Sequence, residues 1–398
     1  MFETLESLPA DPLLGIITQY QQETNPQKID LGVGVYKDAS GEMPVLPCIK
    51  TAEQRLVSEQ ASKTYRGPLG NPEFTRLMCD LALGEQLSDT MRGRMAALQT
   101  PGGCGALRVA AELIVRANPS AKIWVSDPTW ANHVPLLGDA GMEIASYPYY
   151  DFENKGLRFD AMMACLAAAT PGDLVLLHAC CHNPSGADLS QSQWQEVVAL
   201  LIEKQLIPFV DMAYQGFGQG LTEDAYGLRL VVEQCPEVVF ALSCSKNFGL
   251  YRDRVGVVGF VVRTADQAEV TLGNLTQIVR GIYSMPPDHG ASVVEMVLAD
   301  KALTSQWLQE LADMRERIQL TRQSLSEKMA AAGFGSRFDF VKHESGMFSF
   351  LGISPEQVST LASRFGIYMA PSSRVNIAGL NASNLDYFCA SLTEILNA

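Results

Sequence analysis

The sequence predicts an α/β protein with a mainly parallel, seven-stranded sheet covered by helices, together with a smaller α+β domain. From about residue 94 to 262, short apolar runs typical of buried strands alternate with helical patterns. Beyond about residue 300, long helical patterns prevail. The chain has 398 residues, which is enough for two or three domains and a large core.

The strands of the predicted sheet are the short apolar runs between residues 94 and 262. Their positions are 96–99, 122–125, 144–147, 173–177, 207–210, 238–242 and 257–262. Before them, residues 47–60 and 71–85 read as helices, the second with Asn71 as its cap and Pro72 at its first position. The segment 63–70 between these helices is predicted to be a stiff, exposed loop.

The two ends of the chain supply the smaller domain. Helices are expected at 302–332 and 381–396, with weak strands near 338–341 and 347–351. Residues 1–12 read as an arm whose apolar Phe2 and Leu5 need a surface to dock on. The expected division is therefore an arm at 1–12, a large domain at 46–300, and a small domain from 13–45 plus 301–398.

Charge and cysteine usage exclude several classes of function. The 44 acidic and 30 basic residues give a net charge of −14, which argues against nucleic acid or an anionic membrane as a partner. The nine cysteines are scattered without metal-binding spacing, as expected in a reducing compartment. No secretory signal is evident and no apolar run reaches the ~18 residues of a membrane helix. These features predict a cytoplasmic protein without a metal site.

Lys246 lies in a polar turn directly after the apolar run 238–242. A lysine at the end of a buried strand can be partly desolvated, which favours a neutral and nucleophilic amine. Arg254, eight residues later, could bind a phosphate through its fork of donors. Taken alone, a serine-flanked lysine is more often an ordinary loop residue.

Other polar residues follow the predicted strands. The turn Gly102–Gly105 opens a helix and suits an anion, although a turn needed only for packing is equally consistent. Trp130 either presents a flat ring face to a ligand or fills the core. Asn183 either binds a ligand or belongs to an ordinary Asn-Pro turn. Asp211 ends an apolar strand and requires a cation as its partner.

Seven segments in order resemble one family. They include P-G-G-x-G-A-L from Pro101, the segment around Trp130, H-N-P-x-G from His182, D-x-A-Y-Q-G from Asp211, and S-x-S-K-N-F-G-L-Y-x-x-R from Ser243. R-x-x-Y-S-x-P-P from Arg280 and R-V-N-x-A-G from Arg374 complete the set. Together they are similar to the pyridoxal-phosphate aminotransferases of the aspartate and aromatic amino acid group. The resemblance spans nearly the whole chain and implies the fold type I architecture.

The resemblance implies a pyridoxal phosphate site. Lys246 would form the internal Schiff base and later move the proton as general acid/base. The phosphate would be bound by residues of two turns, namely Gly102, Gly103, Cys104, Ser243 and Arg254. Cys104 stands where the family usually has threonine or serine, and a thiol is the poorer donor.

The ring of the cofactor has its own expected partners. Trp130 would stack on it with His133 behind, Asn183 and Tyr214 would bind its phenolic oxygen, and Asp211 would pair with its protonated nitrogen. The resemblance also implies cis peptide bonds before Pro128 and Pro184. Both histidines near Asn183, at 178 and 182, are expected to be structural rather than metal ligands.

Substrate binding is expected from both halves of the chain. Arg374 would clamp the α-carboxylate of the substrate, and Arg280 would bind a distal carboxylate. At Gly34 the backbone could pass close to a ligand, or the strand could simply turn a corner there. Arg280, and Tyr65 as a cofactor contact, would come from the neighbouring subunit of a homodimer with shared active sites.

The expected reaction is transamination between an L-amino acid, either aspartate or an aromatic one, and 2-oxoglutarate. Met43, Thr64 and Met285 at the expected pocket rim favour aromatic substrates beside aspartate. The alternatives are another fold type I enzyme, such as a β-lyase or decarboxylase, a nucleotide-binding oxidoreductase using the Gly102 turn, and a non-catalytic binding protein. The paired arginines disfavour the first, and the oxidoreductase leaves Lys246 and Asp211 without roles.

Overall fold

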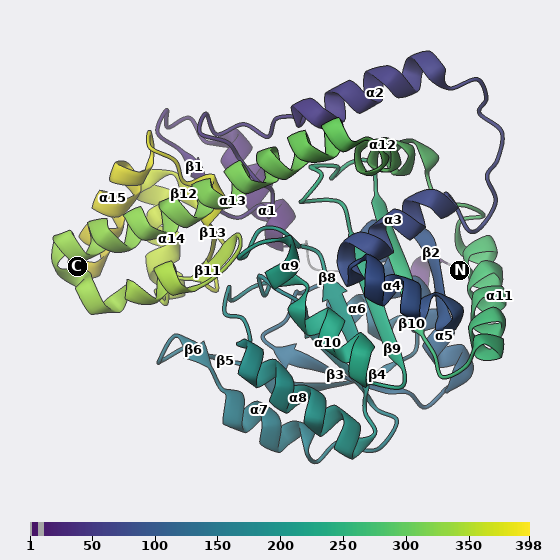
Figure 1. Ribbon diagram of the computed structural model, residues 1–398. Helices are drawn as coiled ribbons and strands as arrows, with labels where there is room; N and C mark the ends of the chain where they lie inside the picture. The colour runs from purple at the N-terminus through teal and green to yellow at the C-terminus, as the bar shows by residue number, and fades with distance from the viewer. Residues whose placement is uncertain (1, 7–11) are drawn as a thin grey trace. The chain divides into compact units, whose positions relative to one another are not determined.

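A computed structural model describes residues 2–6 and 12–398 (Figure 1). The chain forms two compact units, one from Pro44–Arg317 and the other from the described residues up to Met43 together with Ile318–Ala398. The arm and the two functional domains expected from the sequence stay a prediction, and residues 7–11 of the arm lie outside the described residues. In the described parts of the chain, no helix has the length and hydropathy that a membrane crossing requires.

A seven-stranded sheet is the centre of the larger unit. The strand order is β2-β10-β9-β8-β7-β3-β4, and only β10 runs antiparallel to its two neighbours. All seven predicted strands are confirmed, with ends shifted by a few residues. Their bounds are β2 (Met95–Pro101), β3 (Lys122–Asp127), β4 (Glu143–Pro148), β7 (Leu174–His178), β8 (Ile207–Met212), β9 (Val238–Ser243) and β10 (Val255–Val261).

The central strands are apolar because both of their faces are covered. All six residues of β9 and all seven of β10 are buried, so their side chains cannot alternate between core and solvent. Helix α5 (Gly102–Ala117) packs on β9 and β10, and α11 (Ala265–Ile282) packs on β2. A second set of helices, including α8 (Gln191–Lys204) and α10 (Tyr226–Gln234), lies beside the sheet in Figure 1.

The remaining elements of the larger unit flank this sheet. Helix α3 (Pro72–Leu83) begins as predicted, because the side chain of Asn71 accepts hydrogen bonds from the amides of Glu73 and Phe74. The loop before it contains no helix or strand. The other elements are α2 (Pro47–Glu59), α4 (Glu85–Met91), η2 (Arg92–Arg94), α6 (His133–Gly138), β5 (Tyr150–Asp151), β6 (Gly156–Leu157), α7 (Phe159–Leu166), α9 (Leu221–Asp224) and α12 (Asp288–Ala299).

The smaller unit combines helices with two short strand pairs. Strand β1 (Ile29–Asp30) pairs with β12 (Ile367–Tyr368) in parallel, and β11 (Phe348–Phe350) pairs with β13 (Arg374–Asn376) antiparallel. The predicted strand at 347–351 is therefore confirmed as β11. The helical elements are η1 (Phe2–Thr4), α1 (Pro12–Gln22), the second part of α13 (Lys301–Met329), η3 (Ala330–Phe334), η4 (Gly335–Arg337), η5 (Asp339–His343), α14 (Pro355–Phe365), η6 (Ile377–Gly379) and α15 (Leu385–Asn397).

The strand predicted at 338–341 is wrong, because this segment forms the 3₁₀ helix η5. Phe338 and Val341 are both fully buried, and a spacing of three residues brings side chains to one side of a 3₁₀ turn. The carbonyl of Val341 also accepts a hydrogen bond from the buried guanidinium of Arg322, so it is paired with a side chain and not with the backbone of a neighbouring strand. The helix predicted to reach 332 ends at Met329, where π-helical η3 contains Gly333 at φ 94°.

Candidate active site

The polar residues singled out in the larger unit lie at the carboxyl ends of neighbouring strands. Ser243 is the last residue of β9, and Lys246 follows it in the next turn. Asp211 lies near the end of β8, Asn183 follows β7, and Trp130 follows β3. Because β9, β8, β7 and β3 are consecutive in the sheet, their carboxyl ends meet along one edge.

The amine of Lys246 lies over an aromatic ring. Its Nζ is 4.7 Å from the centroid of the Tyr214 ring. Burial lowers the pKa of Lys246, while the negative charge of Asp211 acts in the opposite direction and Arg254 in the same one. A lysine with a lowered pKa is neutral more often than a surface lysine, which makes it a better nucleophile and base.

Asp211 is joined to a chain of hydrogen bonds. Nε2 of His133 lies 3.0 Å from Oδ2 of Asp211, and Nδ1 of His133 lies 2.8 Å from the hydroxyl of Thr129. The same hydroxyl lies 3.3 Å from Nε2 of His178. Burial acts to raise the pKa of Asp211, but the hydrogen bond from His133 and the charge of Lys246 hold it below its ordinary value. Asp211 is therefore a carboxylate that can hold a cation.

Stacked rings support this chain. The rings of His178 and His182 are 4.2 Å apart, and the ring of His182 stacks on Tyr149 at 4.1 Å. Hydroxyls of Ser126 and Ser185 lie 3.0 and 2.8 Å from the two nitrogens of His182. Burial lowers the pKa of His178 to about 3 and that of His182 well below its usual range, so both are neutral.

A second group surrounds the start of α5. A Cβ added to Gly102, whose φ is +72°, would lie 2.6 Å from Nη2 of Arg254, and one added to Gly103 would lie 3.2 Å from Cβ of Ser243. Nη1 of Arg254 donates to the Ser245 hydroxyl at 3.3 Å. The absence of side chains at the two glycines thus lets the guanidinium approach the first amides of the helix, and this arrangement suits an anion.

Cys104 lies in the first turn of α5, where its Sγ is 3.9 Å from Nδ2 of Asn132. Asn183 is buried, its Nδ2 lies 3.5 Å from the hydroxyl of Tyr214, and its Oδ1 has no hydrogen-bond partner in the described chain. The peptide bonds before Pro128 and Pro184 are cis, as the resemblance implies.

Two of the expected site residues lie apart from this group. Tyr65 is 90% exposed in the loop before α3, beside a hollow of about 790 Å³ that Thr64 and Met285 also line. Arg280 is exposed in the last turn of α11 and donates a hydrogen bond to the hydroxyl of Ser284. Within the described chain, no hydrogen bond or ion pair joins either side chain to the group around Lys246.

The remaining expected residues lie in the smaller unit. Nη2 of Arg374 donates to the carbonyl of Gly32 at 2.8 Å, and its guanidinium lies 4.7 Å above the ring of Phe348. A Cβ on Gly34 would lie 2.9 Å from Cζ of that ring, so the backbone passes close to it. Asn376 fixes this loop, because its Nδ2 donates to the carbonyls of Val33 and Val35.

The sequence indicated the main members of the site but not all of its supports. Thr129, Ser245 and Tyr149 were not singled out. A threonine one residue before Trp130 and a serine one residue before Lys246 are the local signals that point to the first two. Tyr149 has no local signal, because it follows β4, and its contact with His182 after β7 depends on β3 pairing with both of these strands in the sheet.

Comparison with known proteins identifies the family. The model of the family described as aminotransferase class I and II matches residues 26–392. The chain is 44% identical over 398 residues to an aspartate aminotransferase of Salmonella typhi, and the match covers all of both chains. It is 43% identical over 394 residues to an aromatic-amino-acid aminotransferase of Pseudomonas aeruginosa, covering 99% of this chain and 98% of that relative.

Solved structures agree with this result. The crystal structure of an aromatic-amino-acid aminotransferase from Burkholderia pseudomallei, covalently bound to pyridoxal phosphate, has a TM-score of 0.97 and 39% identity, covering 100% of this chain and 99% of that one. The aromatic aminotransferase of Psychrobacter sp. B6, cocrystallised with aspartic acid, also has a TM-score of 0.97, with 42% identity and 100% coverage of both chains. The expected fold type I architecture is confirmed, and this chain belongs to the class I and II aminotransferases.

Proposed function

We propose that this protein transfers the amino group between an L-amino acid, aspartate or an aromatic one such as tyrosine or phenylalanine, and 2-oxoglutarate, with pyridoxal phosphate as its cofactor. The observation that carries the proposal is the position of Lys246. Its amine has a lowered pKa and lies over Tyr214, at the same sheet edge as Asp211. The similarity to relatives named for aspartate and for aromatic amino acids supports both substrate classes.

The residues present fit pyridoxal phosphate. The first amides of α5, the hydroxyls of Ser243 and Ser245, and Arg254 form a donor set suited to a phosphate dianion. Among the described residues, no carboxylate forms an ion pair with Arg254, so its charge is available to an anion. The buried Oδ1 of Asn183 has no partner within the chain, which is expected of a side chain that contacts a ligand.

When bound, the cofactor supplies an electron sink that stabilises negative charge at the substrate Cα. Asp211, held as a carboxylate by His133, would keep a proton on the ring nitrogen. Trp130 would cover one face of the ring, and Asn183 and Tyr214 would bind its phenolic oxygen. Lys246 would hold the cofactor covalently and, once displaced by the substrate amine, its neutral amine would take the proton from Cα and return it as an acid.

Substrate recognition is assigned to arginines. Arg374, supported by Gly32 and Phe348, would clamp the α-carboxylate through two parallel hydrogen bonds. Arg280 would bind a distal carboxylate in the active site of a partner subunit, and Tyr65 would contact the cofactor there. Their exposure and their lack of hydrogen bonds or ion pairs to the group around Lys246 support this shared arrangement. The active unit would therefore be a homodimer.

The two arginines bear on the reaction class, and the cysteines bear on the location. A β-lyase or a decarboxylase would not need two arginines for two carboxylates, which favours the transaminase. We also propose that the protein works in the cytoplasm, since all nine cysteines are free thiols and seven of them are buried.

The test of the function is the visible spectrum of the purified protein. We expect a yellow enzyme that bleaches on addition of aspartate or phenylalanine and recovers with 2-oxoglutarate. Lys246→Ala should fold normally but lose the borohydride-reducible link to the cofactor and nearly all transamination. Lys50→Ala, which removes an exposed lysine from α2, is the matched control and should behave as wild type. Wild-type turnover by Lys246→Ala would refute the function.

A further inference from the structure

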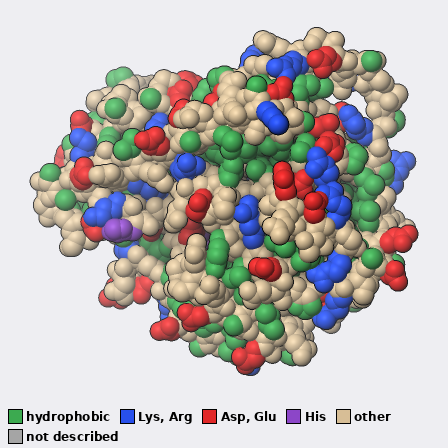
Figure 2. Space-filling model, viewed as in Figure 1, with side chains coloured by type: hydrophobic (Ala, Val, Ile, Leu, Met, Phe, Trp, Pro, Cys, Tyr) green, Lys and Arg blue, Asp and Glu red, His purple; other side chains and the backbone are tan. Residues whose placement is uncertain are grey.

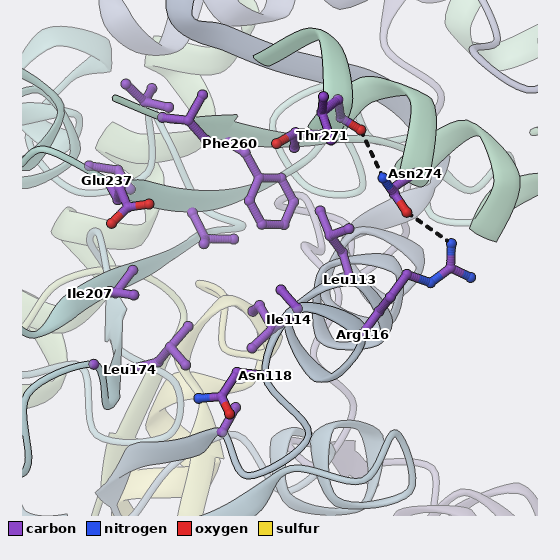
Figure 3. Close-up of a pocket in the computed structure, with 18 residues that line it drawn as sticks. Leu113, Ile114, Arg116, Asn118, Leu174, Ile207, Glu237, Phe260, Thr271 and Asn274 are labelled. Atoms are coloured by element: carbon purple, nitrogen blue, oxygen red, sulfur yellow. Dashed lines mark hydrogen bonds between the residues drawn. The ribbon is translucent and has the colours of Figure 1, made fainter. Parts of the chain in front are cut away.

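An apolar hollow of about 450 Å³ lies at the amino ends of β7, β8 and β9, whereas the candidate active site lies at their carboxyl ends. Figure 3 shows the residues that line the hollow. Its lining includes Leu174, Ile207 and Val238, which are the first residues of β7, β8 and β9. Asp211 and Ser243 lie at the carboxyl ends of β8 and β9. At about 3.3 Å per residue, a strand of this length separates the two places by roughly 20 Å. The hollow is therefore a separate place from the candidate active site.

Apolar side chains form most of the walls of the hollow, and one glycine lies at its rim. Phe260 projects into its middle from β10, between Leu113 and Ile114 of α5 on one side and the sheet on the other (Figure 3). At its rim, Gly172 has no atom within 4 Å of the position where a Cβ would stand. Val270, 65% exposed on α11, extends the apolar surface to the mouth. Volumes of about 300–1,000 Å³ with mainly apolar walls are typical of small-molecule sites.

The mouth of the hollow carries one positive charge that no carboxylate neutralises. Arg116, at the end of α5, donates hydrogen bonds to the neutral side chains of Asn274 at 3.3 Å and Gln277 at 2.7 Å. In the described chain it forms no ion pair. Glu237 also lines the hollow, but its carboxylate pairs with Arg263 at 3.1 Å. In a protein of net charge −14, an uncompensated arginine beside an apolar hollow favours an anion with an apolar body.

We propose that this hollow binds a small monocarboxylate with an apolar body, such as a medium-chain fatty acid. The apolar chain packs against the side chains of Phe260 and Leu113 and covers the exposed surface of Val270. The carboxylate lies at the mouth and accepts charge-assisted hydrogen bonds from Arg116. The site does not depend on the transaminase function, because none of its residues takes part in that chemistry.

The experiment is calorimetric titration of the holoenzyme with decanoate, in the presence of saturating succinate to occupy the candidate active site. We expect one decanoate per chain and weaker binding of decanol, which has the same body without the charge. Arg116→Gln should weaken decanoate binding about tenfold or more, the loss of a charge-assisted hydrogen bond. Arg108→Gln removes the same charge from the same helix two turns earlier and should leave the affinity unchanged.

A second variant tests the cavity itself. Thr271→Trp fills the mouth from α11 and should abolish binding without changing the spectrum or turnover of the enzyme. Undetectable binding of decanoate at millimolar concentration, equal binding by Arg116→Gln, or competition with succinate would each overturn the proposal. It would also be overturned if decanoate bound only after Phe2→Ser and Leu5→Ser, because the apolar N-terminus of a second copy would then be the natural occupant.

Discussion

Nε2 of His133 lies 3.0 Å from Oδ2 of Asp211, at the end of a chain of hydrogen bonds that begins at His178. A carboxylate can only accept, so Nε2 of His133 donates to it. The hydroxyl of Thr129 donates to Nδ1 of His133 and accepts from Nε2–H of His178. Every donor in the chain therefore points toward Asp211, which strengthens the last bond and keeps the carboxylate charged.

The hydroxyl of Thr129 connects both halves of this chain, so we expect Thr129→Val to destabilise the protein. Valine has a similar shape but leaves Nδ1 of His133 and Nε2–H of His178 without their partner. An unsatisfied buried polar group costs about 1–3 kcal/mol. Urea denaturation of the holoenzyme should show a loss of that size, while Thr129→Ser, which keeps the hydroxyl, should retain most of the stability. Equal stabilities for the valine and serine variants would contradict the role of the hydroxyl.

His178 should make stability depend on pH below neutrality. Its pKa is about 3 in the folded protein against an ordinary 6.5. Between these values the unfolded chain binds a proton that the folded protein does not, so stability falls as the pH falls. From pH 6.5 to 5 the contribution is at most about 2 kcal/mol. Urea midpoints at pH 7 and pH 5 should therefore differ less for His178→Asn than for wild type, whereas replacement of the exposed His289 should leave the difference unchanged.

We expect Cys104 to bind the cofactor phosphate more weakly than a threonine at this position would. Replacing its thiol by a hydroxyl in Cys104→Thr adds a better donor at the start of α5. A neutral hydrogen bond is worth about 0.5–1.5 kcal/mol, so we expect cofactor affinity to rise about two- to tenfold. Equilibrium dialysis of the apoenzyme against pyridoxal phosphate measures it. Cys165→Thr, a partly exposed thiol on α7, is the control, and a Cys104→Thr variant with unchanged or lower affinity would exclude a phosphate contact at this position.

Replacement of Arg280 should lower kcat/KM for aspartate much more than for phenylalanine. Arg280→Ala removes the charge proposed to bind a distal carboxylate, at a cost of about 1.5–3 kcal/mol for aspartate, or roughly 10- to 150-fold in kcat/KM. Phenylalanine makes no such ion pair and should lose much less. Steady-state kinetics with both substrates decide the matter, with Arg337→Ala as a control for an exposed arginine. Equal losses on aspartate and phenylalanine would refute a pocket with two modes of binding.

A mixture of two inactive variants should test the shared active site. In a heterodimer of Lys246→Ala and Arg280→Ala, one site receives both lesions and the other receives none, if Arg280 serves the partner subunit. After complete exchange, half of the dimers are mixed, so aspartate activity should return to about a quarter of wild type. Separate assays of each variant give the baseline. No recovery despite demonstrated exchange would mean that both residues serve the same subunit's site.

The sequence determined the elements whose signal is local. Buried strands such as β9 and β10 are recognised because every one of their side chains must be apolar when both faces are covered. Asn71 followed by Pro72 marks the start of α3 by capping chemistry that needs no distant partner. The resemblance carried by segments such as the one around Lys246 identified the family.

The tertiary structure decided what depends on residues far apart in the chain. The hydrogen bond from His133 to Asp211 joins positions 78 residues apart and exists because β3, β7 and β8 are neighbours in the sheet. The segment after Phe338 is helical rather than extended because the buried Arg322 supplies a donor that no local pattern indicates. The hollow around Phe260 is likewise lined by side chains from several separate elements, since packing in three dimensions, not periodicity along the chain, determines where space remains.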